Sequence, residues 1–274
     1  MELVTALLSS LLVLISPVGV VIDQVAEDAI RSRLAGVESL EVRVDNGPSF
    51  QVLQGRVDRV RIAGRGIVPT PGLRLAVAEL ETDPIDLEFK SLRQGEVVLD
   101  EALQGALHLV ITEADINAFL QSPTVTQRLG ELKIGSLNQA QARERERYKI
   151  NNPVIEFLGD DRLKISLELE DLVQEGTLQI DAESGLSISE GDLLTLVDPV
   201  LGVNGQPAPS RLVNALLGDV NDRLSLQRLE NRGVTARVIN LAVQPDAIDL
   251  ALWLRIDPSV TAPVVATTEM DTLE

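Results

Sequence analysis

The fold class follows from the segment Leu163-Lys-Ile-Ser-Leu-Glu-Leu-Glu170. Leucine or isoleucine stands at each odd position, and a polar or charged residue stands at each even position. Successive side chains of a β-strand point to opposite faces, so this alternation predicts a strand with one apolar face and one face in water. One wetted face is common in antiparallel sheets, whereas parallel sheets are covered on both sides. The segment therefore predicts an antiparallel sheet.

The same alternation returns near the end of the chain, where apolar side chains stand at every second position of 248–256. Further apolar runs bounded by turn residues predict additional strands. They lie at 40–44, 50–67, 73–80, 85–89 and 105–111. The glycines within 50–67 predict that this run is divided into two or three strands with bulges.

Helical periodicity is found in the segments 23–34, 112–120 and 210–224. The second of these begins like a capped helix, because Thr112 can accept a hydrogen bond at its start and Asp115 follows three residues later. Groups of strands separated by single helices indicate an α+β fold with a large, mostly antiparallel sheet. So few helices do not cover the apolar faces of so many strands, and we expect an apolar groove.

We expect a single domain in two halves, with an additional segment at each end of the chain. The segments are 1–22 (apolar), 23–138 and 150–257 (the halves of one domain, 23–257), 139–149 (a polar connection) and 258–274 (a flexible tail). Residues 151–274 carry 8 basic and 21 acidic side chains, a net charge of −13. This charge favours a protein partner with a basic surface.

Residues 3–22 form an uncharged apolar stretch that would be about 30 Å long as a helix, enough to cross the core of a bilayer. Three alternatives follow: a membrane anchor, a helix lying on the membrane or packed on the domain, and a cleaved export signal. Pro17 and Gly19 would interrupt a continuous span. The acidic Glu2, where an export signal would have basic residues, departs from the signal pattern.

Composition excludes several classes of function. A net charge of −18 repels nucleic acid, so we expect no nucleic-acid partner. With no cysteine and one histidine, the chain has neither a thiolate site nor a multi-histidine metal site, and we expect no metal and no cofactor. Carboxylate pairs such as Glu168 and Glu170 arise by chance among 42 acidic residues, and aromatic residues at 2% provide no sugar platform. We therefore expect no enzyme.

Three segments together resemble the bacterial family of LmeA-like phospholipid-binding proteins. They are Val25-Ala-Glu-Asp-Ala-Ile-Arg-Ser-Arg33, Gln54-Gly-Arg-Val-Asp-Arg-Val-Arg-Ile-Ala-Gly-Arg-Gly66 and Ile111-Thr-Glu-Ala-Asp-Ile-Asn-Ala-Phe-Leu120. The resemblance covers roughly residues 20–256. It implies an elongated, curved sheet wrapped against a few helices, similar to tubular lipid-binding folds. It also implies a phospholipid held in an apolar groove, without catalytic residues.

Two sets of side chains are candidates for such a site. The groove lining is predicted from the apolar strand faces and the stripe of the third helix, namely Leu163, Ile165, Leu167, Leu169, Leu212, Leu216, Val220, Ile248, Leu250, Leu252 and Leu254. For the head group we consider a basic cluster, namely Arg56, Arg59, Arg61 and Arg65. Arginine binds phosphate through forked donors, but cross-strand pairing with carboxylates is the alternative for this cluster.

The sequence thus favours non-enzymatic binding of a phospholipid or other polar lipid, with the ability to carry it. We expect a membrane-associated protein of the cell envelope; the resemblance favours the periplasmic side and leaves the cytoplasmic side open. The alternative is a membrane-anchored structural or interaction module of the envelope that has no lipid ligand.

Overall fold

The computed structural model describes residues 27–28, 30–47, 51, 54–92, 98–130, 148–172, 176–208 and 225–258. The expected apolar segment at 1–22, the helix at 210–224 and the tail from 259 lie outside these residues, as does most of the polar connection at 139–149. In the described part of the chain antiparallel strands dominate and helices are few, which confirms the predicted α+β class.

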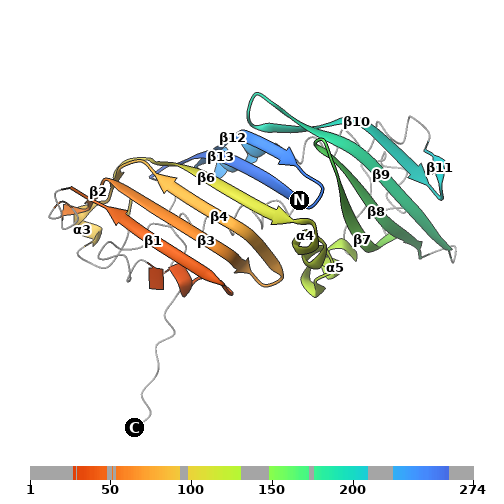
Figure 1. Cartoon of the computed structure of the whole chain (residues 1–274), viewed down its shortest axis with the longest axis horizontal. Coiled ribbons are helices and arrows are strands. Elements are labelled where there is room, and N and C mark those ends of the chain that lie inside the picture. The colour runs from red at the N-terminus through yellow and green to blue at the C-terminus, as the bar shows by residue number, and fades with distance from the viewer. Residues whose placement is uncertain are drawn as a thin grey trace, which may run out of the picture.

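Six antiparallel strands form the larger sheet, in the order β1-β3-β4-β6-β13-β12 (Figure 1). They are β1 (Ser39–Asp45), β3 (Arg59–Thr70), β4 (Leu73–Thr82), β6 (Leu103–Thr112), β12 (Val234–Val243) and β13 (Ala247–Ile256). Along β6 every second residue is buried, as the alternating pattern requires. One face of this sheet therefore packs on the core, and the other faces outward.

Five antiparallel strands form the second sheet, in the order β11-β10-β9-β8-β7. They are β7 (Tyr148–Gly159), β8 (Arg162–Asp171), β9 (Gly176–Ser189), β10 (Leu193–Val203) and the short β11 (Gln206–Pro207). A small third sheet pairs β2 (Arg56–Val57) with β5 (Ile85–Asp86). The helical elements include α3 (Phe89–Leu92), α4 (Glu113–Leu120), α5 (Pro123–Gly130) and the 3-10 helix η3 (Leu226–Arg232), and residues 27–28 and 30–31 are also helical.

The path of the chain does not follow the two halves read from the sequence. After the five-stranded sheet the chain returns to the six-stranded sheet, where β13 pairs with β6 from Ala247 opposite Thr112 to Ile256 opposite Leu103. The five-stranded sheet is therefore an insertion between β6 and β12. Alternation along a strand shows which face is apolar but not which strand lies beside it, so the sequence pattern does not reveal this return.

The main core lies on the inner face of the six-stranded sheet. Its central residues, such as Leu75, Leu107 and Leu109, are fully buried. Leu226 and Leu229 of η3 pack into the same cluster. Removing a leucine from a core of this kind costs about 2–5 kcal/mol, so this cluster supplies much of the stability of the chain.

Helix α4 holds the five-stranded sheet at one edge and lies between the two sheets in Figure 1. The helix begins as predicted, because the Asp115 N–H donates to Thr112 Oγ1 over 3.1 Å. The Asn117 side chain then makes both backbone hydrogen bonds of Ile155 on the edge strand β7, at 2.7 and 2.8 Å. The Glu113 carboxylate accepts from the Phe157 N–H at 2.7 Å. The edge of β7 is thus paired to a helix that follows directly from β6.

Two tight turns of the five-stranded sheet hold the edge strand β12 in the same way. The Val243 N–H donates to Asp161 Oδ1 at 2.9 Å, and the Asp161 N–H donates to the Val243 carbonyl at 3.3 Å. Farther along β12, the Val238 N–H donates to the Gly191 carbonyl at 2.6 Å. Edge strands invite pairing with other chains when their backbone groups are free. At this joint between the two sheets, the edge of β7 is therefore bonded to α4, and the edge of β12 is bonded to turns of the five-stranded sheet.

Candidate functional site

The five-stranded sheet has one apolar face, built around β8. Leu163, Ile165, Leu167 and Leu169 all point to this face, as their spacing predicted. Directly opposite residues of antiparallel strands share a face, so the register extends it over the neighbouring strands. The added residues are Ile150, Ile155 and Phe157 of β7, Leu178, Ile180, Ala182, Ser184, Leu186 and Ile188 of β9, and Leu194, Leu196, Leu201 and Val203 of β10. None of these residues is charged.

This apolar face is only partly shielded from solvent. All ten residues of β8 are of intermediate exposure. Among the described large apolar residues of the sheet, Phe157 at 4% and Leu201 at 9% exposure are the buried ones. An apolar sheet face is normally covered by another layer, so partial exposure over this length is the main irregularity of the fold. The face retains apolar surface that a ligand can cover.

At the joint the apolar face runs into the core of the six-stranded sheet. Ile188 and Leu194 of the smaller sheet pack against the core cluster, as do Leu241 and Leu250 of the larger sheet. Apolar contacts are therefore continuous from one sheet to the other. The packing is closed on the side of the larger sheet and open along the smaller one.

The predicted lining residues of β13 differ in burial from those of β8. Leu252 is 2% exposed and Leu254 is 6% exposed, and both belong to the core cluster. Ile248 and Leu250, nearer the joint, are partly exposed. The structure therefore leaves Leu252 and Leu254 almost no surface for a ligand. The predicted residues Leu212, Leu216 and Val220 lie outside the described residues.

The predicted head-group arginines lie away from the apolar face. Arg59, Arg61 and Arg65 project from β3 on the outward face of the other sheet, and Arg56 belongs to β2. Each has a carboxylate partner, namely Asp86 for Arg56, Glu81 for Arg59, Asp45 for Arg61 and Glu79 for Arg65. This is the cross-strand pairing given above as the alternative to phosphate binding.

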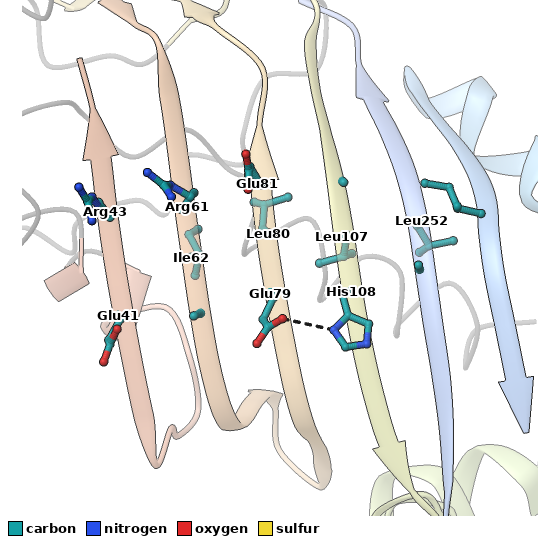
Figure 2. Close-up of a pocket in the computed structure, with 14 residues that line it drawn as sticks. Glu41, Arg43, Arg61, Ile62, Glu79, Leu80, Glu81, Leu107, His108 and Leu252 are labelled. Carbon is teal, nitrogen blue, oxygen red and sulfur yellow. Dashed lines mark hydrogen bonds and ion pairs between the residues drawn. The ribbon is translucent and has the colours of Figure 1, made fainter. Parts of the chain in front are cut away.

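A shallow depression of about 440 Å³ lies on the same outward face (Figure 2). The small side chains of Ala63, Ala106 and Ala251 leave space there between longer neighbours. The charged residues lining it are Glu41, Arg43, Arg61, Glu79, Glu81 and His108. Arg43 and Arg61 are both in an ion pair with Asp45.

His108 bridges two carboxylates beside this depression. Its Nδ1 lies 3.3 Å from Glu79 on β4, a contact drawn in Figure 2, and its Nε2 lies 3.2 Å from Asp249 on β13. The hydrogen bond to Asp249 is the main cause of a raised pKa of His108, and burial opposes it. Hydrogen bonding to Arg65 and then to His108 lowers the pKa of Glu79, while partial burial acts in the opposite direction. Both ring nitrogens are engaged, so the histidine is paired.

A polar cluster at the joint end of the apolar face was not foreseen from the sequence. Asp192 follows the turn between β9 and β10, and its Oδ2 lies 3.5 Å from Nη2 of Arg237 on β12. The Gln227 Nε2 of η3 donates to the same oxygen at 3.3 Å. Glu230 of η3 pairs with Arg237 at 3.0 Å. These residues come from three separate elements, so no spacing in the sequence signals the cluster.

The described residues were also compared with the requirements of a metal site and of a membrane-spanning helix. In the part of the chain that the structure describes, no group of three or more histidine, aspartate or glutamate side chains is placed to hold a metal ion. No helix within the described ranges has the length and apolar character needed to cross a membrane.

Comparison with known proteins gives one result. A family model described as LmeA-like phospholipid-binding matches residues 14–252, which is most of the chain. Neither the curated proteins nor the solved structures include a significant match. The match confirms the resemblance drawn from the three quoted segments. The chain therefore belongs to the LmeA-like phospholipid-binding family.

Proposed function

We propose that this protein binds a phospholipid without chemical conversion and places the acyl chains on the apolar face of the five-stranded sheet. Family membership supports the lipid class. The observation that carries the location is that this face is uncharged and that all ten residues of its strand β8 are only partly buried. In β13, the other alternating strand, Leu252 and Leu254 belong to the core instead.

The energetics require no specific polar contact for the acyl chains. Each methylene removed from water contributes about 0.8 kcal/mol. Covering part of a long acyl chain therefore gives several kcal/mol, enough for binding in the absence of a sequence motif. A ligand held by desolvation alone leaves by the same route, so the protein can carry lipid as well as hold it.

The proposal extends to the place of action. Residues 3–22 form an apolar segment long enough to attach the protein to a bilayer, which favours a membrane-associated protein of the cell envelope. The net charge of −13 over residues 151–274 favours a basic protein partner in the same compartment.

A matched pair of substitutions tests the location. Leu167→Lys introduces a charge on the apolar face, whereas Val200→Lys introduces the same charge at a 61% exposed position opposite Glu183 on the other face. The full chain is incubated with phospholipid vesicles and separated from them. Bound lipid is then extracted with organic solvent and counted per protein by mass spectrometry.

We expect the wild type and Val200→Lys to retain similar amounts of lipid, and folded Leu167→Lys to retain roughly tenfold less. Circular dichroism checks that both variants are folded. A lipid-free wild type that takes up no added lipid overturns the proposed function. A folded Leu167→Lys that binds like the wild type overturns the location.

A further inference from the structure

Asp192 has an unusual environment for a carboxylate. It lies at the joint of the two sheets and not at the surface, and its side chain is only 8% exposed. Oδ2 lies near Arg237 and accepts from Gln227, and the backbone carbonyl of Asp192 accepts from the Leu226 N–H at 2.8 Å. Oδ1 is buried and accepts no hydrogen bond from the residues that the structure describes.

A buried acceptor without a donor is costly. A buried polar group left unpaired costs about 1–3 kcal/mol, and a charged group costs more. Buried polar atoms in native proteins are nearly always hydrogen-bonded, so an exception requires an explanation. A carboxylate oxygen only accepts, and its missing partner must therefore carry an N–H or O–H donor.

The charges in the cluster indicate which kind of donor would fit. The guanidinium of Arg237 faces two carboxylates, Asp192 at 3.5 Å and Glu230 at 3.0 Å. Among these three side chains, one positive group faces two negative groups, which leaves the trio with one excess negative charge. A donor that is also a cation satisfies both the free oxygen and this excess, and such charge-assisted bonds are the strong ones.

The cluster is placed at the end of the apolar face. Leu194, two residues after Asp192, belongs to that face, and two residues of chain span at most about 7 Å. Arg237 and Glu230 are partly exposed, and they connect Asp192 to solvent. A ligand with apolar chains along β8 to β10 thus has its polar end within reach of Asp192.

We infer that Asp192 is the head-group acceptor of this protein and that it selects phospholipids whose head group ends in an ammonium that carries an N–H, as in phosphatidylethanolamine. This inference rests on the proposed function, because it assumes that acyl chains lie on the adjoining face. It also moves the head group away from the arginines of β2 and β3, which are already paired.

The test uses lipids that differ only in their N–H donors. The full chain is incubated with vesicles containing equal amounts of phosphatidylethanolamine and phosphatidylcholine with identical acyl chains. Bound lipid is extracted and the ratio is measured by mass spectrometry. The choline head group has no N–H, so we expect the wild type to enrich phosphatidylethanolamine about tenfold or more. The N,N-dimethyl lipid retains one N–H and should retain most of this enrichment over phosphatidylcholine.

Two variants separate recognition from a structural role. Asp192→Asn preserves size but removes the charge, and we expect it to lose the enrichment while total bound lipid is maintained. Asp198→Asn makes the same change in charge at an exposed position of β10 and should leave the ratio unchanged.

The outcomes are distinguishable. A wild type that binds both lipids equally overturns the head-group inference and leaves the proposed function intact. Enrichment that persists in Asp192→Asn removes Asp192 from recognition. Absence of bound lipid of any kind overturns both proposals. The comparison of methylated lipids needs only the wild type, so the test stands even where Asp192→Asn fails to fold.

Discussion

The side chain of Asn117 substitutes for a β-strand opposite Ile155. Its Nδ2 donates to the Ile155 carbonyl at 2.7 Å, and its Oδ1 accepts from the Ile155 N–H at 2.8 Å. One amide thereby completes the hydrogen bonding of a strand edge that would otherwise be open. It also ties the insertion to the helix that leaves the larger sheet.

Replacing this amide should loosen the joint. Asn117→Ala leaves two partly buried backbone groups without partners, which is expected to lower the free energy of unfolding by about 2 kcal/mol or more. Urea unfolding followed by circular dichroism measures the change. Asn231→Ala, at an exposed position of η3, is the control and should stay within about 0.5 kcal/mol of the wild type. Equal stability of the two variants would show that the Asn117 pairing contributes nothing.

The two alternating strands should respond differently to truncation. Leu252→Ala removes a side chain that is 2% exposed and should cost about 2–5 kcal/mol. Leu167→Ala removes a partly exposed side chain and should cost less than about 1.5 kcal/mol. Thermal and urea unfolding compare the two. Similar losses would mean that the β8 face is packed as tightly as the core, contrary to the proposed lipid site.

Stability should depend on pH through His108. Because its pKa is raised in the folded protein, the protonated histidine stabilises the fold below about pH 6.5, its usual pKa in an unfolded chain. That contribution is lost as pH rises through the higher folded value. His108→Gln should therefore lower stability on the acidic side of this window and remove the pH dependence within it.

Glu79 gives the opposite dependence at lower pH. Its folded pKa is lowered, so its contribution is present above its usual value of 4.5 and is lost as pH falls through the folded value. The free energy of unfolding, measured by urea titration across both windows, follows the two groups. A His108→Gln profile that matches the wild type would show that the two ion pairs do not contribute.

The outward arginines offer a direct comparison with the head-group prediction from the sequence. Arg59→Gln and Arg65→Gln break exposed ion pairs with Glu81 and Glu79, and each should change stability by about 0–1 kcal/mol. Bound phospholipid per protein, counted by mass spectrometry, should be unchanged. Loss of lipid in both folded variants would instead favour phosphate binding on this face.

Local patterns in the sequence located some of the elements, but they predicted neither the strands β7, β9, β10 and β12 nor the arrangement of the sheets. Alternation identified β8 and β13, and the spacing of Thr112 and Asp115 identified the start of α4. Each of these patterns is formed by residues only a few positions apart in the sequence. The same alternation in β8 and β13 gave no indication that Leu252 would be packed and Leu167 left partly exposed, because burial depends on what lies opposite each strand.

The joint between the sheets and the polar cluster could not be predicted from the sequence for a related reason. Asn117 and Asp161 each act through a single side chain on a distant backbone, and neither residue belongs to a periodic pattern. The cluster of Asp192, Gln227 and Arg237 is assembled only when three elements meet. An isolated aspartate after a turn is read from sequence as a solvated residue, and only burial distinguishes Asp192.

The return of β13 to β6 has a consequence for synthesis on the ribosome. Strand β6 is complete at Thr112, but its neighbour begins only at Ala247, after residues 113–246 have been translated. At elongation rates of about 5–20 residues per second this interval lasts on the order of ten seconds. Throughout it, the nascent chain displays the unpaired edge of β6, with its row of leucines, to other chains. Chains that stop short of 247 keep that edge permanently, so premature termination should produce aggregation rather than a soluble fragment.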